Sequence, residues 1–95
     1  MSGRMQAIVI DPADNVATAI QDLKAGDAAV TPRGEIVLVR NIPFGHKFAL
    51  IDINPGEYVI KYGAQIGRAT VSIAQGDHVH VHNVEDVVDE VRKTV

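Results

Sequence analysis

The 95-residue sequence contains no cysteine and no tryptophan, and aromatic residues make up only 4% of it. Without cysteine the chain has no disulfide framework, no thiolate zinc site and no cysteine nucleophile, and it fits a reducing cytoplasm. So few aromatic side chains argue against a stacking surface for nucleic-acid bases. The formal net charge of −3 argues against a strongly basic surface, so we expect no nucleic-acid partner.

The sequence also lacks long apolar runs. None approaches the roughly 20 residues that cross a bilayer, and the first residues do not show the pattern of a signal peptide. We therefore expect a cytoplasmic protein that has no membrane partner. The length suits one small domain, and an apolar share of 46% is ordinary for a folded chain.

Short apolar runs separated by turn residues predict a mostly β fold. Residues 6–10 and 35–39 are β-branched runs typical of strands. Turn signals containing proline, glycine or asparagine then recur about every ten residues. Residues 15–24 are the exception, because their apolar positions follow at helical spacing between Asp14, a candidate N-cap, and Gly26, a candidate C-cap. We predict one short α-helix there, near the N-terminus.

One short motif recurs along the chain: an apolar residue, two spacers, a glycine, two further residues and a large apolar residue. Copies begin at Ile42, Ile53 and Ile73, and a weaker copy begins at Leu23. Each copy is expected to supply a buried anchor, a tight turn that needs glycine and a strand that re-enters the core. The copies are too short and uneven for a solenoid. They favour a small folded-over barrel of short hairpins.

The C-terminal residues have a different character. Valines at 84, 87, 88, 91 and 95 lie near one face of a predicted helix, and charged residues occupy the rest. Valine is a mediocre helix former, so such a helix needs something to pack against. We expect a domain over residues 1–84 and a valine-rich C-terminal tail or linker over residues 85–95.

Three histidines alternate with valines in residues 78–82. If this segment is a strand, His78, His80 and His82 share one face, and Val79 and Val81 face the core. Imidazoles two residues apart lie roughly 6.6 Å from each other along a strand, which a divalent metal could bridge. All three in a row would strain a tetrahedral site. The alternative is a polar, solvated strand face.

Two further segments carry candidate substrate-binding residues. His46 and Lys47 follow a turn glycine, and together they offer a hydrogen-bond donor, an acid or base and a positive charge for a carboxylate. Lys61 and Tyr62 lie in a glycine-containing segment that has no phosphate-binding motif. The alternative for all four is an exposed, solvated position. No Ser-His-Asp set or carboxylate pair can be assigned, so the catalytic residues stay unknown.

Several segments, in order, resemble the N-terminal domain of the altronate/galactarate dehydratase family. They cover residues 5–84 and comprise Asp14–Ala17, Gly45–Leu50, Asp52–Ile53, Val59–Gly63, Ile66–Gly67 and Gly76–Asn83. The domain resembled is called the SAF domain, and it has a β-clip fold. The related (R)-sulfolactate sulfo-lyases carry this domain as a separate small subunit, and the present chain looks like such a free-standing subunit or a fragment.

The resemblance implies a role in a carbon–oxygen or carbon–sulfur lyase. Members of the family dehydrate sugar acids such as altronate or galactarate and depend on a divalent metal, iron or manganese, while the sulfo-lyases desulfonate sulfolactate. The chain would be the small subunit or N-terminal domain of such an enzyme, and this chain alone need not bind the metal. It would pack on a large catalytic subunit, and it would contact the substrate, a small anionic 2-hydroxy acid. A homo-oligomer is compatible with the same residues.

Two other classes of protein fit these observations. β-Clip domains also occur in sialic acid synthases and antifreeze proteins, and a fold does not fix a function. A non-enzymatic carbohydrate- or anion-binding module is therefore the main alternative. A simple metal-binding protein that uses the histidines of residues 78–82 is the third hypothesis.

Overall fold

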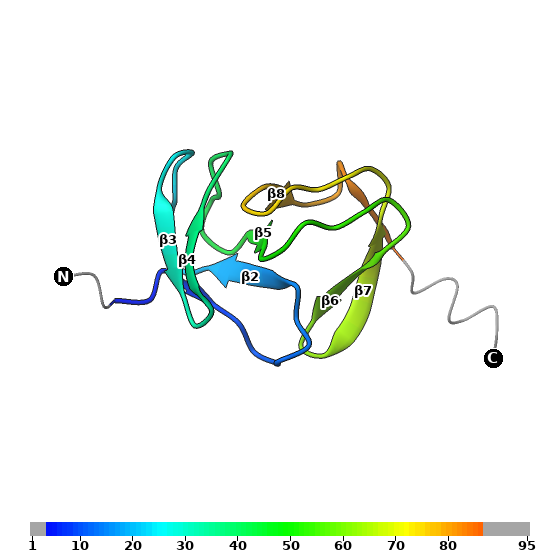
Figure 1. Ribbon diagram of the computed structural model, residues 1–95, viewed down its shortest axis with the longest axis horizontal. Coiled ribbons are helices and arrows are strands. Elements are labelled where there is room, and N and C mark those ends of the chain that lie inside the picture. The colour runs from blue at the N-terminus through cyan, green and yellow to red at the C-terminus, as the bar shows by residue number, and fades with distance from the viewer. Residues whose placement is uncertain (1–3, 87–95) are drawn as a thin grey trace.

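The computed structural model describes residues 4–86, which form nine short β-strands (Figure 1). The mostly β prediction is therefore confirmed. The strands are β1 (Ala7–Ile8), β2 (Val16–Ala19), β3 (Ala28–Thr31), β4 (Gly34–Val37), β5 (Lys47–Ala49), β6 (Tyr58–Lys61), β7 (Ala64–Ala69), β8 (His78–Val79) and β9 (Val84–Asp86). No helix in this described part of the chain has the length and apolar character needed to span a lipid bilayer.

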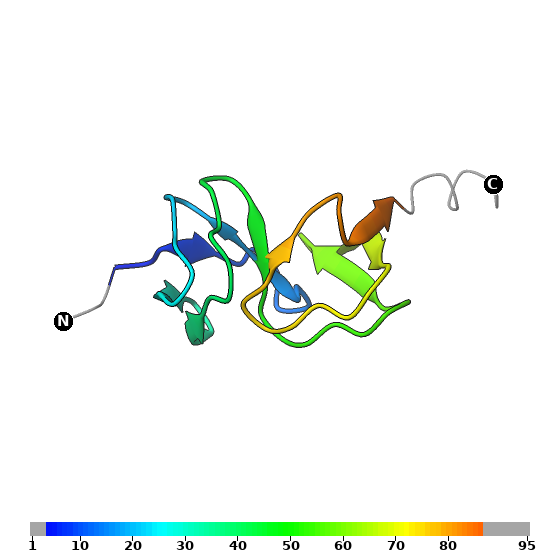
Figure 2. The ribbon, with the colours of Figure 1, turned by 90° about the horizontal axis from the view of Figure 1, so that it is seen from above.

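The strands form three antiparallel sheets. A four-stranded sheet with the order β1-β2-β5-β8 lies in the middle of the molecule. The β3–β4 hairpin lies at one end, and the three-stranded sheet β6-β7-β9 lies at the other (Figures 1 and 2). This arrangement of small hairpins around a short central sheet is the expected β-clip architecture.

The central sheet separates two apolar clusters. Because successive side chains of a strand point to opposite faces, the β2–β5 pair contributes to both. The partners Ala17 and Phe48 belong to the cluster on the side of the β3–β4 hairpin, and the partners Val16 and Ala49 belong to the cluster beside β6 and β7. The middle strands are consequently buried on both faces.

The recurring glycine motif builds the turns between strands, as predicted. Its four apolar anchors, Leu23, Ile42, Ile53 and Ile73, are all buried. They meet in pairs, because isolated β-bridges join the first to the second and the third to the fourth. In each copy the residue after the glycine donates its backbone N–H to the carbonyl three residues earlier, at 2.9–3.0 Å. The sequence repeat is therefore a structural repeat of anchored tight turns.

The helix predicted over residues 15–24 is wrong. Residues 16–19 form strand β2, and Leu23 is the anchor of the first turn copy. The apolar spacing that resembled a helix comes from a strand with buried residues on both faces. Asp14 does not cap a helix, because its carboxylate accepts hydrogen bonds from the backbone N–H groups of Ile10, Asp11 and Gly63.

Other element boundaries also differ from the predictions. The strand predicted over residues 6–10 is limited to Ala7–Ile8, and the one predicted over 35–39 runs from Gly34 to Val37. Residues 84–86, the expected start of the apolar tail helix, form β9 and pair with β7. Residues 87–95, which hold the rest of that predicted helix, lie outside the described residues. The division of the chain after residue 84 stays a prediction.

Candidate functional site

Three histidines in and next to the paired strands β5 and β8 of the central sheet lie close together. In the β5–β8 pair Lys47 lies opposite Val79 and Phe48 lies opposite His78, and continuing this register places His46 opposite His80. The ring centroids of His46 lie 5.1 Å from His78 and 4.7 Å from His80, and those of His78 and His80 lie 5.3 Å apart. We call His46, His78 and His80 the histidine cluster.

Two rings of the histidine cluster are joined directly by a hydrogen bond. Nδ1 of His46 lies 2.9 Å from Nε2 of His78, so one nitrogen donates a hydrogen bond and the other accepts it. One ring nitrogen from each of the three histidines can be chosen so that all lie within 4.8 Å of one another. Nitrogen atoms at such separations can act together on one small ligand.

His82 does not belong to this group. Its ring is tilted against that of His78 at a centroid distance of 5.4 Å, and it contributes no nitrogen to the close set. Strand β8 ends at Val79 and residues 81–83 form a turn, so the predicted alternating strand stops early. Val79 is buried as expected, but Val81 is 83% exposed, and its predicted place in the core is wrong.

Asn83 explains why the strand ends there, and its role was not predicted from the sequence. Its backbone N–H donates to the carbonyl of His80, which closes the turn. Its side chain accepts from the backbone N–H of His80 and donates to the carbonyl of His78. An asparagine after a strand-like run is a known turn signal, because its side chain can bond nearby backbone groups. That signal could have identified the turn.

The electrostatic environment favours neutral imidazoles. Burial lowers the pKa of His78, and the positive forms of His46, His80 and His82 lower it further, against a smaller opposing effect of Asp77. Desolvation also lowers the pKa of His80, together with the charges of His46, Lys47 and His82. A neutral imidazole keeps a lone pair for a proton or a metal ion. His78 and His80 therefore offer unprotonated ring nitrogens near neutral pH.

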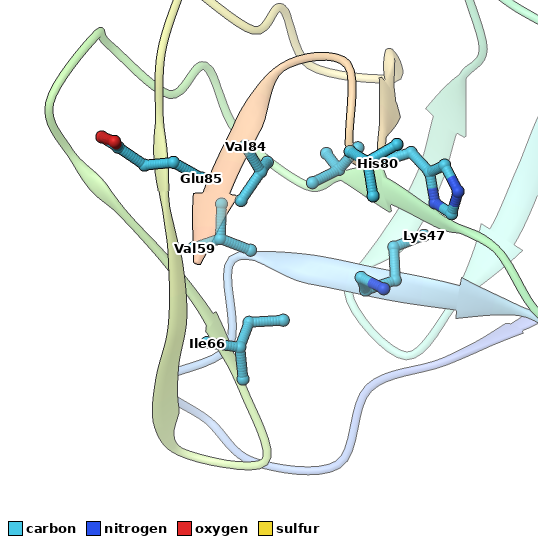
Figure 3. Close-up of a pocket in the computed structure, with 8 residues that line it drawn as sticks. Lys47, Val59, Ile66, His80, Val84 and Glu85 are labelled. Carbon is cyan, nitrogen blue, oxygen red and sulfur yellow. The ribbon is translucent and has the colours of Figure 1, made fainter. Parts of the chain in front are cut away.

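Lys47 lies beside the histidine cluster and lines an open pocket of about 240 Å³. In Figure 3, Lys47 and His80 lie on one side of this pocket, and Val59, Ile66 and Val84 lie on the other. The pKa of Lys47 is lowered by burial and by the positive charge of Lys61. The structure thus places Lys47 next to His80 in the pocket lining. It also places Lys61 near enough to lower the pKa of Lys47.

Tyr62 is separate from this group. It lies in the turn between β6 and β7 with a positive φ of 57° and is 58% exposed. Its ring contacts the ammonium group of Lys61, whose Nζ lies 4.8 Å from the ring centroid. Tyr62 does not line the pocket beside Lys47. A role of Lys61 and Tyr62 in substrate binding stays a prediction.

The short strands, the three small antiparallel sheets and the anchored glycine turns define a small all-β domain of the β-clip class. The family model of the altronate/galactarate dehydratase SAF domain matches residues 5–87. The chain belongs to this family, which confirms the resemblance found in the sequence.

Its relatives are lyases or lyase subunits that are longer than the matched region. Altronate dehydratase of Escherichia coli is 48% identical over 79 residues, which are 83% of this chain and 16% of that protein. The (2R)-sulfolactate sulfo-lyase subunit alpha of Chromohalobacter salexigens is 59% identical over 44 residues, which are 46% of this chain and 47% of that subunit. Galactarate dehydratase (L-threo-forming) of E. coli is 40% identical over 74 residues, 76% of this chain and 14% of that enzyme. The matched region thus spans less than half the length of each of these relatives.

Proposed function

We propose that this chain forms one wall of the active site of a cytoplasmic lyase, as its small subunit or its N-terminal domain. The enzyme would remove water from a sugar acid such as altronate or galactarate, or sulfite from sulfolactate. A large catalytic polypeptide would complete the site. The observation that carries this proposal is the convergence of His46, His78 and His80 beside Lys47, within a family whose relatives are named as dehydratases and a sulfo-lyase subunit.

The charge of the site favours an anionic substrate. Lys47 and Lys61 lie near enough for one to lower the pKa of the other. Neither lysine forms an ion pair with a carboxylate among the described residues. A carboxylate ligand would therefore relieve the repulsion between the two ammonium groups. A small 2-hydroxy acid supplies such a carboxylate next to the carbon that must react.

A neutral imidazole whose lone pair is not on a metal ion fits the first step of this elimination. A base removes the proton from the carbon next to the carboxylate, and the C–H electron pair becomes the new C=C bond. The bond from the neighbouring carbon to oxygen or sulfur breaks, and its electron pair leaves with the departing group. Hydroxide takes up a proton and leaves as water, whereas a sulfonate group leaves as sulfite. Lys47 would hold the carboxylate and stabilise the negative charge that develops on it.

The surface around the pocket favours completion by another polypeptide. Val81, which is 83% exposed, lies at the pocket together with the apolar side chains of Val59, Ile66, Val79 and Val84. A sugar acid offers no apolar group to cover this surface. A partner that covers it would also exclude water from the neighbouring histidines, which strengthens electrostatic interactions with the substrate.

The proposal can be tested by reconstitution. The chain is mixed with the large region of a family dehydratase or sulfo-lyase from which the matching domain has been removed. Formation of a 2-oxo acid is then followed with altronate, galactarate and sulfolactate, and sulfite is also measured for sulfolactate. We expect activity only when both polypeptides are present and with one of the three substrates.

Variants then test whether His46, His80 and Lys47 form part of the active site. The double variant His46→Ala/His80→Ala should abolish the reconstituted activity, and Lys47→Gln should raise KM more than it lowers kcat. Lys24→Gln is the matched control, because Lys24 is exposed and does not line this pocket. A complex that forms and works equally well with His46 and His80 replaced would contradict the proposal. Direct binding of a sugar acid to the isolated chain, without activity in any mixture, would favour the non-enzymatic alternative.

A further inference from the structure

We propose that His46, His78 and His80 form a binding site for one divalent transition-metal ion within this chain. The geometry points to this set, in which His46 takes the place that the sequence suggested for His82. The inference rests on the ring positions and does not require the proposed lyase reaction.

The spacing of the nitrogens fits coordination by a single ion. Two nitrogen ligands of one metal, each about 2.0–2.1 Å from it, lie about 3.0–3.4 Å apart. Nδ1 of His46 and Nε2 of His78 are already 2.9 Å apart, and one ring nitrogen of each of the three histidines can be chosen so that all lie within 4.8 Å of one another. His80 is exposed, so a small side-chain rotation can bring its ring to the same ion without disturbing the core.

The donor set favours particular metals. Three imidazoles without a carboxylate suit iron(II), zinc, copper or nickel, whereas magnesium, calcium and manganese prefer oxygen ligands. Of the two metals expected for the complete enzyme, the residues in this chain therefore fit iron better than manganese. Three protein ligands leave coordination positions open for water or an anionic ligand. The metal, when bound, would supply Lewis-acid stabilisation of a negatively charged oxygen.

Hydrogen bonds of the backbone fix the positions of the three histidines without a bound metal. The His46 N–H donates to the carbonyl of Pro43, and its own carbonyl accepts from Ala19. His78 is paired with Phe48 in the sheet. The backbone of His80 is held by the turn that Asn83 closes. A ligand set whose backbone is fixed by sheet and turn hydrogen bonds loses little backbone freedom on binding, which favours affinity.

The site is testable on the full 95-residue chain without any partner. The chain is freed of metal with a chelator, the chelator is removed, and zinc, cobalt(II) and anaerobic iron(II) are titrated by calorimetry. We expect one ion per chain with a dissociation constant in the micromolar range or below. His46→Ala, His78→Ala and His80→Ala should each weaken binding by about tenfold or more, whereas His82→Ala, the matched control from the same segment, should change it little.

A measurement on the unaltered chain identifies the ligands without relying on variants that could fail to fold. Nitrogen-15 spectra of the four imidazoles, recorded with and without zinc, show which ring nitrogens bind the ion. Shifts confined to His46, His78 and His80 support the site. Absence of binding at micromolar metal, or a ligand set of His78, His80 and His82 without His46, would overturn it. Neither result depends on lyase activity, so a failure here is distinct from a failure of the proposed function.

Discussion

The side chain of Asn83 accepts a hydrogen bond from the backbone N–H of His80 at 3.0 Å. The same side chain donates to the carbonyl of His78 at 2.8 Å, so one buried amide links two of the three clustered histidines. Asn83 is therefore a positioning residue, which acts on the site through the backbone of its neighbours.

Replacing Asn83 should disturb both stability and metal binding. Asn83→Ala removes two hydrogen bonds and leaves backbone groups without partners, which should cost about 2 kcal/mol of unfolding free energy. The loosened turn should also weaken zinc binding by about tenfold. Urea denaturation and calorimetry measure the two effects.

Two comparison variants separate positioning from general damage. Asn83→Asp keeps the acceptor for His80 and should recover part of the zinc affinity. Asn54→Ala changes an exposed turn asparagine whose side chain forms no hydrogen bond among the described residues, so it should affect neither measurement. Unchanged zinc affinity in a folded Asn83→Ala variant would show that the turn does not position His80.

Two turn glycines with almost the same backbone conformation should respond differently to alanine. Gly45 has a φ of +84° and open space where a Cβ would lie, so Gly45→Ala should cost about 1–2 kcal/mol for its left-handed backbone. Gly76 has a φ of +86°, but a Cβ there would lie 2.1 Å from the carbonyl oxygen of Val37. Gly76→Ala should therefore be clearly more destabilising. Equal urea midpoints for the two variants would contradict this packing argument.

Asp14 should make the fold sensitive to acid. Burial raises the pKa of its carboxyl group, but backbone hydrogen bonds from Gly63, Asp11, Tyr62 and Ile10 outweigh this and lower the pKa below its ordinary value. The charged form thus stabilises the folded chain above about pH 4, and this contribution is lost as the pH falls through the lowered pKa.

The expected effect of Asp14→Asn follows from the same contacts. The variant should lose about 2–4 kcal/mol of unfolding free energy at pH 7, because the hydrogen bonds to a charged acceptor are lost. It should lose less further stability than the unaltered chain as the pH falls below about 4, where the carboxylate of the unaltered chain becomes protonated. Glu35→Gln, at an exposed strand position, controls for the change in net charge. Parallel pH profiles for the unaltered chain and Asp14→Asn would contradict the assignment.

The features that could be predicted from the sequence are local ones. The anchors Leu23, Ile42, Ile53 and Ile73 are fixed by their distance from a turn glycine a few residues away, and all four are buried. The wrongly predicted helix shows where this reasoning fails. Strand β2 is buried on both faces because tertiary packing surrounds it, and such a strand has no strict alternation to distinguish it from a helix.

The histidine cluster depends on a non-local contact. His46 and His80 are opposite each other only because β5 pairs with β8, about thirty residues further along the chain. Nothing within either segment specifies that register. The sequence therefore identified His46, His78 and His80 as candidates but grouped the last two with His82, which lies in the turn closed by Asn83 and adds no nitrogen to the close set.

Lys47 offers a test that separates metal binding from substrate binding. Its ammonium group lies near enough to His80 to lower the pKa of that histidine, so it also repels a cation bound at the histidine cluster. Lys47→Gln should therefore tighten zinc binding to the isolated chain, by about two- to fivefold for a partly exposed pair of charges. The same substitution should raise KM in the reconstituted enzyme, because the substrate carboxylate loses its positive partner. Higher salt should reduce this gain in zinc affinity, because salt screens the charges. Weaker zinc binding in folded Lys47→Gln would mean that the lysine supports the site by packing, and an unchanged KM would place the carboxylate elsewhere.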